Sequence, residues 1–338
     1  MATATAEASA RSAATVRRQA RPVVGWAVVG TLFLLVEAYA FIHWIASGQA
    51  QRTPTGPDPI PTAMKVEAHT FETVAWIASI GIIWFLVVRP WRRGVPVATD
   101  VVLLGVCATL FWLDPLWVYR HHWANYSGAF VNLGSWAQLP GSSDPTAHAF
   151  PEALIFASAL YLAMVFGGVA AGCWFMRLVA RRFPAWPRTA VAVSGLAFLF
   201  AVDVVLEGLV FVRLGLYVMP GAYGPMINRG HYYQFPLLYG ICVTVTWWAW
   251  SLVRYFRDDR GLTVAERGLD AVAPSGRRRT VLRFVALAGL MNVLGFALFV
   301  IPMNLISLHQ HPWPADFQHR SYLWGGACTT VAECPFAR

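Results

Sequence analysis

The chain contains a single lysine, Lys65, and few charged residues of any kind. Only 13% of its 338 residues are charged, whereas soluble domains carry about 25%. This scarcity argues against a soluble domain. Because Lys65 lies outside the apolar runs, no span supplies the amine that a retinal Schiff base needs. Glycine-rich phosphate loops, a dinucleotide fingerprint and a serine nucleophile elbow are also missing, so we expect no cofactor.

Hydrophobic residues make up 57% of the chain, and its mean hydropathy is +0.51. Each apolar run has about the 17–25 residues that a helix needs to cross a bilayer. The sequence therefore predicts an all-α, polytopic membrane helix bundle with about seven transmembrane helices. The expected spans are about 22–46, 71–88, 98–118, 152–176, 189–211, 233–253 and 284–307.

Nineteen of the 26 lysines and arginines lie before the first run or in the second, fourth and sixth connections. Basic residues concentrate on the cytoplasmic side of membrane proteins, so we expect the N-terminus inside and the C-terminus outside a bacterial plasma membrane. The net charge of +9 then reflects topology and contact with lipid headgroups rather than nucleic-acid binding. We expect a disordered cytoplasmic tail (1–21), a transmembrane domain (22–308) and an extracytoplasmic tail (309–338).

Two of the five cysteines, Cys328 and Cys334, lie in the expected outer tail. In an oxidising compartment, cysteines five residues apart are candidates for a small disulfide loop. A metal site is the alternative, although no further soft ligand lies nearby. The other three cysteines lie inside expected spans, where a free thiol behaves as a small hydrophobic group.

The connections expected outside are rich in glycine, proline, asparagine and aromatic residues, which indicates structured loops. Acidic residues lie in the same outer half: Glu37, Asp114, Glu152, Asp203 and Glu207. Because an ionised carboxylate in hydrocarbon costs at least ~2.5–3.5 kcal/mol, we expect these side chains to face a polar cavity.

Asp203 and Glu207 are four residues apart and share one helix face. We expect them to be the acid/base pair, with Asp114 or Glu152 opposite. Arg213, six residues beyond Glu207, is the natural cation to keep one acid ionised. The alternative for Glu37 is a packing hydrogen bond between helices, and for Asp114, which precedes Pro115, a helix end.

Three other functions stay open. Seven histidines on the expected outer face could, with the acids, form a metalloenzyme site, although no ligand pair has helical spacing. A lipid or terpenoid binding or export protein would use the carboxylates only to pair with arginine. A channel or secondary transporter is also possible, but no internal repeat is visible.

Six segments form one recognisable pattern: the Asp114-Pro115 end of the third run, Asn125-Tyr126-Ser127-Gly128 to Asn132-Leu133-Gly134-Ser135-Trp136, Pro151-Glu152, Glu207 through Arg213-Leu214-Gly215-Leu216-Tyr217, Pro220-Gly221-Ala222, and Tyr233-Gln234-Phe235-Pro236. Together they resemble the spirocyclase AveC family of actinobacterial membrane proteins, over about residues 25–325. The resemblance implies an enzyme that closes spiroketals in polyketides, sometimes with dehydration.

That chemistry needs a general acid and a carboxylate around an oxygenated, hydrophobic substrate that arrives from the lipid bilayer. We therefore expect an amphipathic cavity whose polar and aromatic groups position hydroxyl groups. The candidate substrate-binding residues are Glu37, Asn125, Tyr126, Asn132, Trp136, Arg213, Tyr217, Tyr233 and Gln234.

Overall fold

The computed structural model describes residues 2–144, 146–273, 275–317 and 319–324. Among them, seven helical stretches are long and apolar enough to cross a membrane, which confirms the predicted helix bundle. Several extend beyond the apolar runs, because helices continue past the hydrocarbon into the interface. The stretches are Pro22–Ala46, Thr62–Arg92, Thr99–Val118, Leu154–Arg182, Arg188–Phe211, Leu237–Tyr255 and Gly276–His309.

Several stretches change helix type along their length. Four contain a π-helical segment: η1 (Trp84–Val88), η4 (Tyr161–Val165), η5 (Val204–Phe211) and η7 (Phe296–Val300). The third tightens into the 3₁₀ helix η2 (Leu110–Val118). The α-helices are α1 (Ala2–Ala46), α2 (Thr62–Ile83), α3 (Arg89–Arg92), α4 (Thr99–Thr109), α5 (Leu154–Leu160), α6 (Phe166–Arg182), α7 (Arg188–Asp203), α8 (Leu237–Tyr255), α9 (Leu269–Val272), α10 (Gly276–Gly295) and α11 (Ile301–Ile306).

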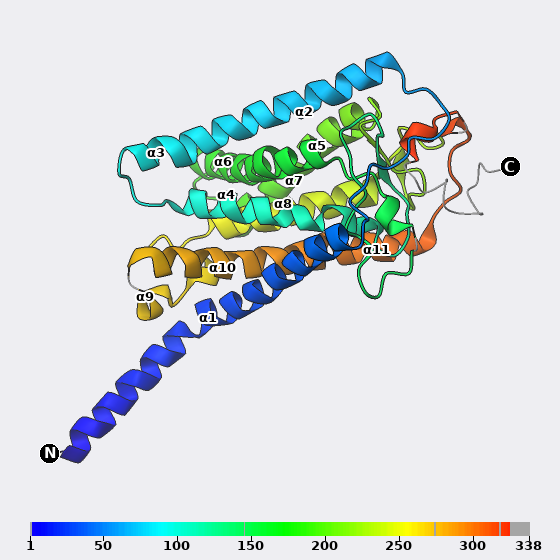
Figure 1. Cartoon of the computed structure of the whole chain (residues 1–338). Coiled ribbons are helices and arrows are strands. Elements are labelled where there is room, and N and C mark those ends of the chain that lie inside the picture. Colours follow the sequence, from blue (N-terminus) through cyan, green and yellow to red (C-terminus); the bar gives the residue numbers. More distant parts are fainter. Residues whose placement is uncertain (1, 145, 274, 318, 325–338) are drawn as a thin grey trace.

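The first helix includes residues 2–21 of the expected cytoplasmic tail, and the division into tail and transmembrane domain stays a prediction. Helix α1 is continuous from Ala2, through Pro22, to Ala46, and it projects beyond the bundle (Figure 1). Alanine and arginine have high intrinsic helix propensity, which explains why the segment 2–21 is helical here in spite of its polar composition.

The two ends of the bundle differ (Figure 1). The start of α1, α3 and α9 lie at one end, and α11 lies with the long loops at the other. At the first end, arginines pair with acids: Arg254 with Asp100 at 2.7 Å, and Arg283 with Glu266 at 2.6 Å. We call the end with these arginine pairs the basic end, and the end with the long loops the loop end. The orientation with the basic end in the cytoplasm stays a prediction.

The loop end is tied together by short antiparallel pairs and by residues 315–324. Strand β1 (Asn125–Tyr126) pairs with β2 (Tyr217–Val218), and β3 (Met226–Ile227) pairs with β4 (Phe235–Pro236). The backbone N–H of Gly128 donates to the carbonyl of Tyr322 at 2.8 Å, and Ser321 N–H donates to Asp58 at 2.8 Å. These contacts agree with the structured loops expected from composition.

The third stretch is the centre of the bundle, since 78% of its most apolar window is buried. The corresponding fractions for the first two stretches are 17% and 11%, so they lie at the periphery. Helices α1 and α10 meet closely at Gly30 and Gly289, where a Cβ on either residue would collide with the opposite backbone. The central position of the third stretch places Asp114, near the loop end, inside the protein.

Candidate active site

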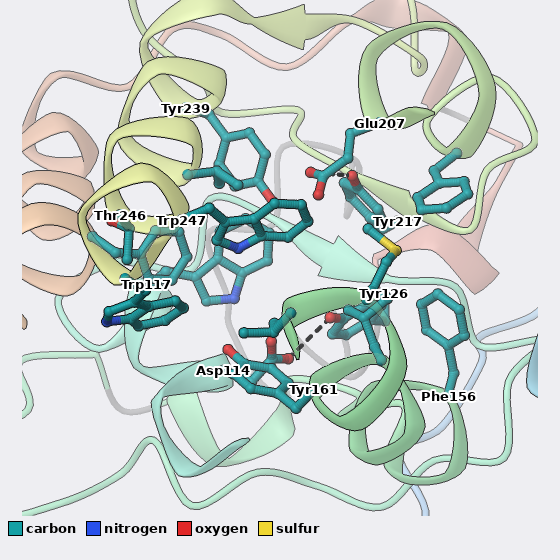
Figure 2. A pocket seen from close by; sticks show the side chains of 17 residues that line it. Asp114, Trp117, Tyr126, Phe156, Tyr161, Glu207, Tyr217, Tyr239, Thr246 and Trp247 are labelled. Atoms are coloured by element: carbon teal, nitrogen blue, oxygen red, sulfur yellow. Dashed lines mark hydrogen bonds between the residues drawn. The ribbon is translucent and has the colours of Figure 1, made fainter. Parts of the chain in front are cut away.

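A buried cavity lies in the half of the bundle nearer the loop end, and Figure 2 shows it from close by. Its volume is about 60 Å³, which is room for a few water molecules. The lining side chains come from η2, β1, α5, η4, η5, β2, α8 and η7. They are Asp114, Trp117, Tyr126, Phe156, Leu160, Tyr161, Met164, Val165, Glu207, Phe211, Tyr217, Tyr239, Val243, Thr246, Trp247, Trp250 and Phe299.

One carboxylate of the cavity is Asp114, which is only 8% exposed. Its Oδ2 accepts a hydrogen bond from the Tyr126 hydroxyl at 3.0 Å, drawn as a dashed line in Figure 2. Tyr161, at the start of η4, also interacts with this carboxylate. Asp114 and Pro115 lie inside η2, so the Asp-Pro step does not end the helix as the alternative interpretation had it.

The second carboxylate is Glu207, which is 6% exposed and lies on the π-helix η5. Its Oε2 accepts a hydrogen bond from the Tyr217 hydroxyl at 2.6 Å. Tyr239 from α8 interacts with the same carboxylate. The cavity therefore contains two acids, each with tyrosine partners (Figure 2).

The two tyrosines that donate to the acids are neighbours in the β1–β2 pair. Tyr126 lies directly opposite Tyr217 in the register, and their ring centroids are 6.0 Å apart. Burial raises the pKa of both hydroxyl groups well above the ordinary value, and the adjacent acids raise it further. Both tyrosines therefore stay protonated and act as hydrogen-bond donors. The short β1–β2 pair thus positions the donors for both acids.

π-helical segments contribute Tyr161 from η4, Glu207 from η5 and Phe299 from η7. Such segments are rare and occur often at functional sites, because the extra residue re-aims the following side chains. Three of them around one cavity support its assignment as the functional site.

Glu152 and Asp203 are also buried, at 0% and 1% exposure. In the described part of the chain, neither carboxyl group has a hydrogen-bond partner by distance and angle. Burial, and then the neighbouring charge of Asp114, raises the pKa of Glu152 well above its ordinary value. Glu152 thus lies behind Asp114 as a second acid, and neither Glu152 nor Asp203 lines the cavity.

The predicted pair of Asp203 and Glu207 is therefore divided between two environments. Asp203 lies against α8, where a Cβ on Gly240 would be 2.9 Å from its Oδ2, whereas Glu207 lines the cavity. Asp203 still interacts with Glu207, and Asp114, one of the two acids expected opposite the pair, lines the cavity together with Glu207.

Arg213 does not reach these acids. Beyond Phe211 the helix ends, and the exposed Arg213 guanidinium lies 5.1 Å from the centre of the Tyr233 ring. Among the described residues that line the cavity there is no lysine, arginine or histidine. The acids consequently face hydroxyl groups and aromatic rings instead of a counter-ion.

Three other predicted substrate-binding residues hold the loops in place. Asn132 accepts a hydrogen bond from the Thr53 N–H at 3.2 Å, and Trp136 donates to the carbonyl of Trp112 at 2.7 Å. Gln234 donates to the carbonyls of Met219 and Pro220, at 3.1 Å each. Their side chains are engaged with the backbone and do not line the cavity.

The remaining three also lie away from the cavity lining. Asn125 is fully buried beside Tyr126 and bonds to the ring of His122. Tyr233 stacks on His231 at 4.9 Å. Glu37, on the peripheral helix α1, has a buried Oε2 without a partner among the described residues, so the structure gives no support to a packing hydrogen bond there.

Sequence reasoning missed Tyr161, Tyr239, Trp117 and Trp247, which all line the cavity. A signal existed for the tyrosines, because a phenol inside an apolar span must find a hydrogen-bond partner. No such signal marks the tryptophans, whose pattern is the same as that of core aromatics.

Among the described residues, no three histidine, cysteine or acidic side chains form a group that could hold a metal ion. The described histidines of the outer face are therefore not assembled into a ligand set. Cys107, Cys173 and Cys242 are free thiols. Cys328 and Cys334, and with them the predicted disulfide, lie outside the described residues.

The model of one protein family, described as spirocyclase AveC-like, matches residues 91–323. The matched segment contains both acids of the cavity and their tyrosine partners, and it omits α1 and most of the second stretch. No curated protein and no solved structure matches the chain.

Proposed function

Because the chain belongs to the AveC-like spirocyclase family, we propose that it is a membrane-embedded, cofactor-independent cyclase that closes spiroketals by carboxylate acid/base catalysis. The observation that carries the proposal is the pair of acids in one aromatic cavity, each oriented by a tyrosine. Its substrate is a hydrophobic, oxygenated polyketide-like or lipid-like molecule.

In the proposed reaction, one acid of the cavity protonates the hydroxyl group of a hemiketal. The carbon–oxygen bond breaks, water leaves, and an oxocarbenium ion forms. A hydroxyl group of the same molecule adds to this carbon, and its proton passes to the other carboxylate. Substrate therefore equals product plus one water, and no oxidant or co-reactant is needed.

Asp114 and Glu207 fit these two roles because they line the same cavity from different helices. Tyr126 and Tyr217 hold the carboxylates in place and can donate to substrate oxygens when the acids exchange protons. Glu152 and Asp203, each buried near one of these acids, are proposed to store the proton between turnovers. Such groups of close carboxyls separate acid from base because they cannot all ionise together.

The cavity has room for only a few waters, so only the reacting end of a large substrate enters, after the lining side chains move apart. The exposed side of η5, which faces away from the bundle, is apolar, with Val205 at 51% and Leu209 at 45% exposure. We propose that substrate enters here, from the bilayer, on the extracytoplasmic side of a bacterial plasma membrane.

The test compares untargeted lipid and polyketide profiles of the native host with the intact gene and with Glu207→Gln. We expect the variant to accumulate a precursor that is heavier than the lost product by one water. The matched control is Glu67→Gln, since Glu67 lies on α2 away from the cavity lining. A fully active Glu207→Gln protein would overturn the proposal, and a lipid shifted between membrane and medium would indicate transport instead.

A further inference from the structure

Aromatic rings form one side of the cavity. Trp117, Tyr239 and Trp247, which we call the aromatic wall, lie together on one side, and Glu207 and Asp114 approach from other sides (Figure 2). The rings of Trp117 and Tyr239 are 5.3 Å apart. All three residues are less than a tenth exposed.

Neighbouring residues of the protein pack against the rings of this wall. Trp247 packs on Gly168, where a Cβ would lie 2.7 Å from the indole ring, so only glycine leaves room for it. Trp117 is enclosed by Trp123 at 5.5 Å and Phe150 at 6.2 Å, in addition to Tyr239. The wall is therefore preorganised and loses little conformational entropy when a substrate binds.

The acidic groups of the cavity favour the binding of a positively charged species. Its described lining holds two carboxyl groups and no basic side chain. An aromatic face attracts a cation through the negative potential of its ring, and indole does so best. In a buried site this attraction is strongest because water does not compete.

We infer that the aromatic wall binds the oxocarbenium ion that forms when water leaves, with Trp117 and Trp247 as catalytic residues. The inference rests on the proposed function, and it narrows the substrate class to molecules whose reaction passes through a cation. The charge arises when the carbon–oxygen bond breaks with both electrons leaving on water. It disappears when the internal hydroxyl adds and gives its proton to a carboxylate.

The indole N–H of Trp117 supports a role beyond packing. It is buried and has no hydrogen-bond partner in the described part of the chain. By contrast, Trp112 donates at 2.8 Å to the Asn292 side chain, and Trp123 and Trp250 donate to backbone carbonyls at 3.0 Å. An unpaired buried donor is destabilising, and a substrate oxygen in the cavity would satisfy it.

The experiment uses membranes that contain the full chain and the precursor isolated from the Glu207→Gln host. We expect Trp247→Leu to lower kcat about tenfold with little change in KM, because the neutral substrate gains little from the ring face. Trp247→Phe keeps a ring face and is expected to retain most of the rate. Trp174→Leu is the matched control, since Trp174 is 59% exposed on α6.

Equal rates for the Leu and Phe variants, or a change in KM alone, would overturn the inference. If a variant fails to fold, fluorinated tryptophans at position 247 test the same point, because fluorine weakens the ring potential with little change in size. The logarithm of kcat is then expected to fall with each fluorine, and a flat series would overturn the inference. An inactive Glu207→Gln with a fully active Trp247→Leu would remove the aromatic role and leave the proposed function standing.

Discussion

Acidic residues at the two ends of the bundle have different partners. At the basic end, Asp100, Glu266 and Asp270 each accept a hydrogen bond from arginine, at 2.5–2.7 Å for the shortest contact of each. In the cavity, Asp114 and Glu207 accept hydrogen bonds from tyrosine.

We propose that this difference separates structural acids from reactive ones. A guanidinium stabilises the ionised carboxylate and keeps it ionised, which holds loops together but prevents proton exchange. A carboxyl group that is bonded to a phenol, or that lies in an apolar environment, can be either protonated or ionised. Thus the Arg279 hydrogen bond holds the pKa of Asp270 below its ordinary value, whereas burial raises that of Glu152.

The largest expected effect is on turnover. Asp114→Asn removes a proton-transfer group from the cavity, and we expect kcat to fall by a factor of about 10²–10⁴. Asp100→Asn removes a comparable acid from the basic end, where it pairs with Arg254 and Arg257, and is expected to lower Tm with unchanged activity per folded molecule. Conversion of the precursor measures kcat, and thermal unfolding in detergent measures Tm. Equal losses of activity would remove the distinction between the two ends.

Two fully buried glutamates offer the sharpest contrast in stability. Glu266 bonds to Arg283 at 2.6 Å, whereas the Glu152 carboxyl group interacts with Asp114 but has no hydrogen-bond partner by distance and angle among the described residues. Glu266→Gln leaves a partly buried guanidinium without its counter-charge, so we expect a loss of about 3 kcal/mol. At about pH 4.5, where its raised pKa keeps Glu152 protonated, Glu152→Gln removes no charge and is expected to change stability by less than about 1 kcal/mol. Thermal unfolding of both variants measures the two stability changes, and similar Tm shifts would contradict the expected difference between them.

The tyrosine partners carry a smaller effect. Tyr217→Phe and Tyr126→Phe each remove one hydrogen bond to a carboxyl group, worth about 1.5–3 kcal/mol when the group is charged. We expect kcat to fall about 10- to 100-fold in each variant. The control is Tyr223→Phe, since Tyr223 is 42% exposed and does not line the cavity. An unaffected kcat in both cavity variants would show that the acids need no alignment.

The smallest effect is the pH dependence of stability, which has opposite signs at the two ends. Glu152 has a raised pKa, so its contribution is full below about pH 4.5 and is lost as pH rises toward the folded-state pKa. Asp270 has a lowered pKa, so its contribution is present above about pH 3.8 and is lost as pH falls through the folded-state pKa.

We therefore expect Glu152→Gln to flatten the fall of Tm above pH 4.5, relative to the unsubstituted protein. Asp270→Asn is expected to flatten the fall of Tm below pH 3.8. Melting curves across pH 3–9 provide the measurement, and a change of the opposite sign in either variant would contradict the assignment.

The sequence located the acids of the site but left part of their grouping open. Asp114, Glu152, Asp203 and Glu207 were recognisable because an acid in an apolar run is costly and rare. Helical spacing grouped Asp203 with Glu207 and left Asp114 or Glu152 for the opposite side; the structure places Asp114, 93 positions before Glu207, in the same cavity as Glu207. Spacing within one helix says nothing about which neighbouring helix supplies the opposite wall.

Arg213 and Gln234 teach the same point for the loops. Arg213 was expected to keep one acid ionised, and Gln234 lies in a segment that carries the family resemblance, yet Arg213 is exposed and Gln234 bonds to backbone carbonyls. Loop side chains also satisfy buried backbone groups, and the sequence carries no sign of which role a given residue has.

By itself, the sequence determined the seven membrane-spanning stretches, the basic and loop ends, and the half of the bundle that contains the acids. These features depend on local composition, because hydrophobic length and charge act residue by residue. Only the tertiary structure decided which acids share the cavity, which tyrosines hold them and which tryptophans face them. Those contacts join segments that are far apart in the chain, such as Tyr126 and Tyr217 across the β1–β2 register, and no local rule specifies that pairing.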